Sequence, residues 1–382
     1  MIFGLGPLEL AGILAFVIIL FFLPKIMRIR MISSINRTVN ELESIVKEAE
    51  GILIKISKEQ ENPLKDPEES VARFIEFFIV PPMNLDPQGL VKKFDKILEL
   101  GEDRFKDMAY EITPEADEET KSNIIMVIKA TIGLNAVTKL VKHNMEMARK
   151  TGNLQIMLSL QMSLPLLMRM VKAQFEGTKS FSEGQPIGDG IGPLIAGRFI
   201  DNLNSDNQES DLNDLGDMIS SNNKFKGREL TILRAKGPGA RVGPLGKIAT
   251  EIIEKNNISR IISLDATAKL EGEKTGRVAE GVGVVIGGLG IEKWLIEEKA
   301  TSNDIKIDAI VIKMSPEEAI SQMSEEIAES SQMAIDILKK SIIRSPEGSN
   351  ILIIGVGNSS GIPNIVSDIS EIELKKPVNP NN

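Results

Sequence analysis

The feature that most constrains this chain is an apolar stretch at its N-terminus, followed at once by positive charge. From residue 8 to residue 23 every side chain is apolar or absent, except for one glutamate. About 20 such residues span a bilayer, so this end of the chain is just long enough to cross one. Three basic residues follow, and basic residues next to a span stay on the cytoplasmic side: Lys25, Arg28 and Arg30. We therefore expect a single-pass anchor over residues 1–27 in the cell membrane, with all later domains cytoplasmic; the alternative is a buried core helix.

Composition limits the chemistry of the remainder. The chain has 382 residues, 42% of them hydrophobic, which is enough for two or three domains with sizeable cores. It has no cysteine, which excludes disulfides, cysteine-ligated metal centres and thiol nucleophiles, and the single histidine, His143, excludes a multi-histidine metal site. A net charge of -9 gives no reason to expect a nucleic-acid partner, so the basic residues after the anchor are expected to contact the lipid bilayer.

A heptad seam follows the anchor, within a helix expected over residues 28–62. Its apolar residues recur at alternating steps of three and four: Ile32, Ile35, Val39, Leu42, Val46, Ala49, Leu53 and Ile56. Such a seam predicts a parallel coiled coil that makes the chain a homo-oligomer through residues 32–56. It fits one helix of an intramolecular bundle equally well, because just over three heptads is the lower limit for this signal.

An all-helical domain is expected over residues 68–180, after a polar linker that contains two prolines. Its segment from Leu154 to Val171 is apolar enough for a second membrane span. Gln155, Arg169 and the mid-segment Pro165 favour instead a buried helix of a soluble bundle.

From about residue 185 the pattern changes to short β-type runs that alternate with glycines and amphipathic helices, which is typical of α/β proteins. Strands are expected at residues 229–233, 258–264, 308–314 and 350–354. Residues 201–223 are rich in Asn, Asp and Ser and predict a mobile loop. The predicted fold class is an N-terminal transmembrane helix, a coiled-coil stalk and a helical domain. A three-layer α/β domain with a mostly parallel sheet follows over residues 185–370, then a disordered tail over residues 371–382.

Two aspartates, Asp189 and Asp265, are the candidate catalytic residues. Asp189 lies in a Gly-rich segment that precedes an expected helix, and Asp265 directly follows a buried strand. The carboxyl ends of parallel strands are where open α/β sheets place their ligands. Two carboxylates that meet there push their pKa values apart, which would provide one acid and one base for hydrolysis. The alternative is that Asp189 caps the following helix or orders a turn.

Glycines and further acids surround these aspartates in the sequence. The candidate ligand-binding residues are those that would let a backbone approach a ligand closely: Gly188, Gly190, Gly237, Gly239, Gly355, Gly357 and the adjacent Asn358. The loop after Asp265 adds Glu271 and Glu273. Together with the two aspartates, these oxygen ligands would suit a divalent metal such as Mg²⁺, Mn²⁺ or Ca²⁺ as the cofactor.

The segment Gly188–Leu194 with its helix, followed later by a strand that ends Leu264-Asp265-Ala266, resembles two protease families. These are the hydrogenase-maturation endopeptidases and the spore germination proteases, which share a phosphorylase/hydrolase-like α/β fold and carry one acid in each segment. The resemblance implies peptidase-like activity with Asp189 and Asp265 as those acids. In these families a strand similar to Ile353–Asn358 comes directly before the first acid. Here it comes last, so the resemblance implies a circular permutation. The families' metal-binding histidine has no counterpart after Asp265.

The whole chain is also similar to a family of archaeal membrane-anchored proteins of unassigned function, through residues 264–276 and 280–283. That similarity implies no chemistry, so two function classes remain. The first is a membrane-tethered, peptidase-like hydrolase. The second is a non-catalytic oligomeric scaffold or small-ligand sensor on a degenerate hydrolase fold. Carboxylates that meet in a cleft favour the first class, and use of Asp189 as a helix cap favours the second.

Overall fold

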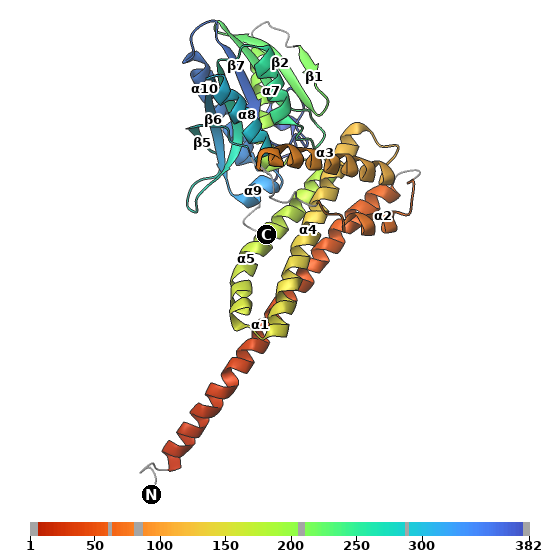
Figure 1. Ribbon diagram of the computed structural model, residues 1–382, viewed down its shortest axis with the longest axis vertical. Helices are drawn as coiled ribbons and strands as arrows, with labels where there is room; N and C mark the ends of the chain where they lie inside the picture. The colour runs from red at the N-terminus through yellow and green to blue at the C-terminus, as the bar shows by residue number, and fades with distance from the viewer. Residues whose placement is uncertain (1–6, 60–62, 80–86, 205–210, 287–289, 377–382) are drawn as a thin grey trace. The chain divides into compact units, whose positions relative to one another are not determined.

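The computed structural model describes the chain except for residues 1–6, 60–62, 80–86, 205–210, 287–289 and 377–382 (Figure 1). The chain forms two compact units. The first comprises Met1–Glu48 with Gly133–Lys172, and the second comprises Ala49–Ile132 with Ala173–Asn382. The region that the sequence predicts as one helical domain, residues 68–180, is therefore divided between the two units.

Helix α1 (Pro7–Lys58) is continuous through both the predicted anchor and the predicted seam. Among the residues that the structure describes, three helices are long and apolar enough to cross a membrane: α1, α4 (Glu118–Thr151) and α5 (Leu154–Ser182). The window in α1 has the highest mean hydropathy of the three, 2.2, and none of it is buried inside the protein. An exposed apolar surface of this size is typical of a helix that lies in lipid.

The first unit is built from α1 up to Glu48, the second half of α4 and the first half of α5. Lys172 of α5 forms an ion pair with Glu41 of α1 at 2.7 Å, and Lys142 of α4 pairs with Glu43. The seam residues of α1 in this unit are buried within the single chain: Ile35, Val39, Leu42 and Val46. Such burial is what the intramolecular alternative predicts. Association of copies through residues 32–56 stays a prediction.

The second unit begins with a helical part that packs directly on the α/β part. It contains α2 (Pro67–Phe74), α3 (Pro87–Ile112), the start of α4 and the end of α5. Its apolar core includes Leu53, Phe74, Phe105 and Phe181, together with Ile187 and Ala240 from the α/β part. The two parts of this unit therefore share one core.

The α/β part contains a seven-stranded sheet in the order β1-β2-β3-β7-β4-β6-β5. The strands are β1 (Leu212–Asp214), β2 (Met218–Phe225), β3 (Arg228–Ala235), β4 (Arg260–Ala268), β5 (Arg277–Val282), β6 (Lys306–Met314) and β7 (Asn350–Gly355). The four central strands, β3, β7, β4 and β6, are parallel, and the outer strands pair antiparallel. This arrangement confirms the predicted mostly parallel sheet.

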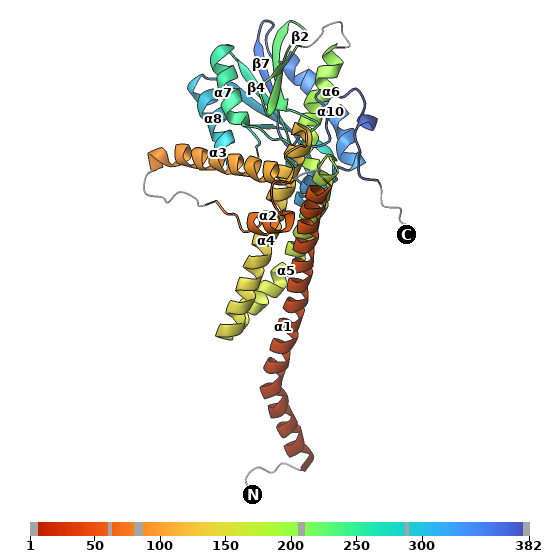
Figure 2. The same cartoon turned by 90° about the vertical axis from the view of Figure 1, so that its right-hand side faces the viewer.

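Helices cover both faces of the sheet (Figure 2). On one face lie α6 (Ile191–Asn204) and α10 (Glu325–Ile343), which share a core with the inward side chains of the parallel strands. On the other face lie α7 (Leu245–Lys255) and α8 (Ile291–Ser302), which form a second, smaller core. The predicted three-layer α/β fold class is confirmed.

Two local expectations are wrong. Within residues 201–223, α6 continues to Asn204, and β2 begins at Met218 and pairs with β3 along its whole length, so this segment is not simply a mobile loop. Between β6 and α10, a capping box at Ser315 begins the short helix α9 (Pro316–Ile320). The expected disordered tail is packed over its first residues, because Ile372 is buried and the Lys375 N–H donates to the Met323 carbonyl; residues 377–382 lie outside the described residues.

Candidate active site

Asp265 lies near the carboxyl end of β4, beside the C-terminal end of the adjacent parallel strand β7. Asp265 is the sixth residue of β4, and Leu264 before it pairs with Gly355, the last residue of β7. Because β7 returns to the sheet between β3 and β4, its C-terminal loop emerges directly beside Asp265. Residues 355–358 therefore leave the sheet next to Asp265.

Asp189 reaches the same edge from a different part of the chain. It lies in a short 3₁₀ turn, η1 (Gly188–Gly190), which leads into α6. Its Oδ2 accepts a hydrogen bond from the Asn358 N–H at 3.2 Å, so the side chain bonds to the loop after β7. Within the described residues its side chain accepts from no N–H group of α6, so Asp189 does not cap that helix; the alternative that it orders a turn stays open.

Glycines make this close approach possible. Gly357 has φ +127, and a Cβ there would clash with the Asp189 carbonyl. A Cβ at Gly192, in the first turn of α6, would clash with the carbonyls of Leu264 and Val356. The start of α6 therefore rests directly on the ends of β4 and β7, and no residue with a side chain would fit at either glycine.

The two carboxyl groups interact electrostatically. Burial, and the nearby charge of Asp189, raise the pKa of Asp265 to about 9. Burial also raises the pKa of Asp189, while the hydrogen bond from Asn358 opposes this rise. Asp265 is only 4% exposed, whereas Asp189 is half-buried and retains some contact with solvent. Both carboxyl groups therefore hold a proton more tightly than an exposed aspartate does, and Asp265, with a pKa of about 9, is protonated at neutral pH.

Asn358 adds an unused hydrogen-bond donor to this edge. Its Oδ1 accepts from the Ser360 N–H at 2.8 Å, but its Nδ2 is buried and has no hydrogen-bond partner in the part of the chain that the structure describes. A buried amide left unpaired costs free energy, so such a group is a reasonable candidate for binding a ligand oxygen.

Family models match two successive parts of the chain, and the boundary between them lies just before Asp189. The N-terminal domain of a protein of unknown function (DUF1512) matches residues 10–184, and the corresponding C-terminal domain of unknown function (DUF1512) matches residues 187–363. The chain belongs to the DUF1512 family. Comparisons with curated proteins and with solved structures gave no significant match. The two aspartates, the loop after β7 and the whole parallel sheet thus lie within the DUF1512 C-terminal domain.

The other predicted ligand-binding glycines in this domain are packed against protein atoms. A Cβ at Gly188 would clash with the Glu318 carbonyl, one at Gly237 with the Ile362 carbonyl, and one at Gly239 with the Ser122 hydroxyl. Cβ atoms at Gly190 and Gly355 would also meet neighbouring protein atoms within 3 Å. Tight chain packing is therefore sufficient to explain these glycines, and their role toward a ligand stays a prediction.

The two glutamates of the predicted metal site are not gathered at the aspartate pair. Glu273 binds the Lys313 ammonium and accepts from the Leu270 N–H at 2.9 Å, and Glu271 is exposed. Within the described residues there is no group of three or more His, Asp or Glu side chains arranged to hold a metal ion. The DUF1512 C-terminal domain therefore presents a carboxyl pair with an amide, rather than a four-carboxylate site.

Sequence reasoning missed two features beside the pair. The first is a polar group in which the Thr275 hydroxyl donates to Glu318 at 2.7 Å and Lys269 lies 3.5 Å from the same carboxylate. The capping box at Glu318 was the only sequence signal for it. The second is Arg234, the largest fully buried side chain, whose guanidinium donates to the carbonyls of Ala235, Ile362, Pro363 and Asn364. Arg234 thereby holds the segment against which Gly190 packs.

Proposed function

We propose that this protein is a membrane-anchored, peptidase-like hydrolase in which Asp189 and Asp265 are the acid–base pair. The observation that carries the proposal is the pair of carboxyl groups at this edge of the sheet: Asp265 on β4, whose pKa is raised to about 9 by burial and by the charge of Asp189, and Asp189, which accepts a hydrogen bond from the loop after β7. Pairs of carboxyl groups whose environments separate their protonation states are the usual signature of acid–base hydrolysis.

Each group has a role that follows from its environment. The Asp189 carboxylate is half-buried and takes a proton from water as the water oxygen attacks the carbonyl carbon of an amide or ester. Asp265, protonated by burial, donates its proton to the leaving nitrogen or oxygen. The free Nδ2 of Asn358 stabilises the oxyanion that forms on the attacked carbonyl. Exchange with solvent then returns the proton from Asp189 to Asp265.

Activity of the full-length chain in detergent tests this assignment. We expect wild-type protein to cleave members of a panel of fluorogenic peptides and chromogenic esters. D189N and D265N should each lower kcat at least about 100-fold, because each removes one partner in proton transfer. The matched control is D336N, which changes an exposed aspartate on α10.

Unchanged turnover in D189N and D265N contradicts the assigned roles. Absence of turnover in the wild type across the panel contradicts the hydrolase and supports the second function class, a non-catalytic scaffold or small-ligand sensor. One observation favours that second class: the space next to the glycines around the pair is occupied by protein atoms and is not open.

The location is part of the same proposal. The exposed apolar surface of α1 supports anchoring, and the three basic residues that follow it support a cytoplasmic position for the rest of the chain. Deletion of residues 1–24 removes most of the apolar window and keeps Arg28, which bonds within the first unit. We expect the truncated chain to leave membranes washed with alkaline carbonate, which strips proteins that do not span. Retention of the truncated chain in the washed membranes would instead assign a span to α4 or α5.

A further inference from the structure

The tip of the α4–α5 hairpin lies beside α1 just after its exposed apolar stretch. The Arg28 Nη2 donates to the main-chain oxygen of Arg149 at 3.2 Å, and Nη1 lies 3.5 Å from the position of a Cβ on Gly152. Met31, Ala148 and Met157 form a small core next to this contact. A helix rises 1.5 Å per residue, so Arg28 lies about 8 Å along α1 from Leu23. This distance is similar to the thickness of one headgroup layer, which is about 5–8 Å on each side of the hydrocarbon core.

The charge of this region is opposite to that of the whole chain. Residues 133–172 contain six Lys or Arg and a single acid, Glu146, in a chain of net charge -9. Arg149 and Lys150 are exposed at the tip, beside the basic residues that follow the anchor. Anionic phospholipids attract basic side chains that lie within a few ångströms of the bilayer surface.

An apolar ridge runs along α5 from the same tip. Leu154, Leu158, Met162 and Leu166 follow one another at four-residue steps and therefore lie on one face. They are 43%, 43%, 81% and 60% exposed. A helix with an exposed apolar face next to basic residues is typical of segments that rest on the membrane interface.

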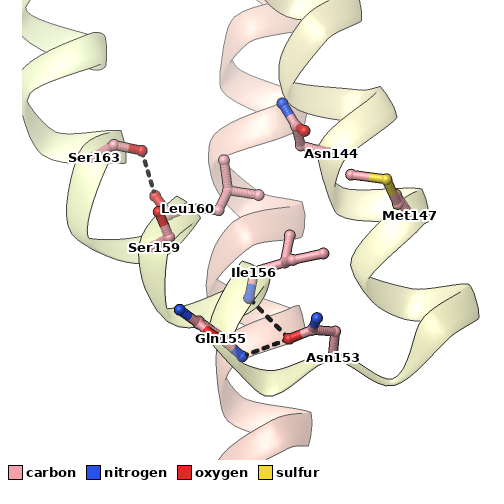
Figure 3. A pocket seen from close by; sticks show the side chains of 8 residues that line it. All are labelled: Asn144, Met147, Asn153, Gln155, Ile156, Ser159, Leu160 and Ser163. Atoms are coloured by element: carbon pink, nitrogen blue, oxygen red, sulfur yellow. Dashed lines mark hydrogen bonds between the residues drawn. The ribbon is translucent and has the colours of Figure 1, made fainter.

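A polar pocket of about 480 Å³ opens between α4 and α5 near the tip (Figure 3). Its polar lining comes from Asn144, Asn153, Gln155, Ser159 and Ser163. Figure 3 shows the Asn153 oxygen accepting from the main-chain N–H groups of Gln155 and Ile156, which fixes the start of α5 at the edge of the pocket. The Asn144 amide and the Ser163 hydroxyl already donate to the carbonyls of Leu140 and Leu160. The donors that the pocket offers to a phosphate next to the basic tip are therefore the side chains of Asn153, Gln155 and Ser159.

The remainder of the hairpin has the wrong chemistry to lie within the hydrocarbon core. The ion pairs Lys142–Glu43 and Lys172–Glu41 join it to α1, and the four side chains are 39–61% exposed. Exposed charges of this kind are expensive in lipid. The hairpin therefore runs away from the bilayer, and only its tip lies at headgroup depth.

We infer that the tip of the α4–α5 hairpin binds the headgroup of an anionic phospholipid. The polar pocket takes the headgroup, Arg149 and Lys150 contact its phosphate, and Leu154 at the start of the apolar ridge lies in the headgroup layer. This inference rests on the proposed anchoring of α1, because the anchor places the tip at the bilayer surface.

Depth-dependent quenching on the full-length chain tests the inference. The protein has no native cysteine, so single labels can be placed by L154C, L158C and L166C, with M333C on α10 as the control. The control position is 59% exposed, within the range of the ridge. In vesicles of brominated phosphatidylglycerol we expect several-fold stronger quenching at position 154 than at 166, with position 158 between them, and none at 333.

Vesicles of brominated phosphatidylcholine should quench the same labels less. The double variant R149Q/K150Q should remove this difference between the lipids, whereas K274Q/R277Q, two exposed residues of the α/β part, should preserve it. Equal quenching at 154 and 333 overturns the inference. Quenching that increases toward 166 also overturns it, because such a gradient would mean that α5 spans the bilayer. Quenching that is the same in both lipids overturns the headgroup site. A chain that does not float with the vesicles at all shows instead that the anchoring of α1 has failed.

Discussion

The variant D265N is expected to be more stable than the wild type at pH 8, on the order of 2–5 kcal/mol in the free energy of unfolding. In the folded protein, burial and the charge of Asp189 raise the pKa of Asp265 to about 9, so this carboxyl stays protonated at pH 8. In the unfolded chain it ionises near its ordinary pKa of about 4. The folded state therefore binds one more proton between these two values, and its stability falls as pH rises through that window. Asparagine resembles the protonated carboxyl and has no ionised form, so it avoids this loss.

Denaturant titrations at several pH values measure the effect. The single tryptophan, Trp294, lies on α8 and reports unfolding of the α/β part in the full-length chain. Between pH 5 and pH 8 the wild type should lose up to about 1.4 kcal/mol per pH unit. D265N should show a shallower slope, and D336N should match the wild type. In D189N the loss should begin near the same pH but end at a lower pH, because the charge that helps raise the folded pKa of Asp265 is gone. Equal slopes in wild type and D265N, or a less stable D265N at pH 8, contradict the assigned protonation.

The variant R234M is expected to lose about 3 kcal/mol or more of the free energy of unfolding. Arg234 is fully buried and donates to four main-chain carbonyls, three of them in residues 362–364. Methionine fills much of the same space but leaves those oxygens without their donors. Burial lowers the pKa of Arg234 to about 9, which is still well above neutral pH, so the guanidinium remains charged where the protein would be studied.

Two measurements separate this effect from a general loss of packing. Trp294 fluorescence gives the change in stability, and amide hydrogen exchange at Ile362 and Val366 should accelerate before the central strands exchange. R234K should recover only part of the stability, because a lysine cannot reproduce the planar fork of donors. The exposed control, R277M, should differ from the wild type by less than about 0.5 kcal/mol. A small effect of R234M would show that the segment 362–364 is held mainly by its apolar contacts.

Local patterns predicted the parts of this fold whose signal is continuous in the chain. The apolar window of α1, the central strands β3, β4, β6 and β7, and helix α7 each show the period of their structure over many residues. The predictions failed where a strand consists largely of polar residues and forms because it pairs with a neighbouring strand. In β2 the buried residues Ser220, Ser221 and Asn223 read as loop residues, yet they lie in a ladder with β3. Strand β2 forms because β3 is present to pair with it. The sequence of β2 alone does not show that β3 lies beside it.

The seam of α1 shows a related limit of prediction from sequence: a correctly predicted apolar face whose packing partner was not predicted. Its heptad spacing predicts an apolar face, and that face is buried as the spacing requires. Spacing does not identify the partner, because the same side chains pack equally well against a second copy or against the chain's own helices.

For the candidate site, the sequence by itself determined that Asp265 follows a buried strand and that Asp189 lies in a Gly-rich segment before a helix. It determined this because the end of an apolar run and a cluster of glycines are local features. Only the tertiary structure decided that the two carboxyl groups interact, that Asn358 lies against Asp189 with a free amide, and that Glu273 binds Lys313 instead. Those outcomes depend on the order of strands and on which groups burial removes from water. Both are properties of the packed chain and not of any segment.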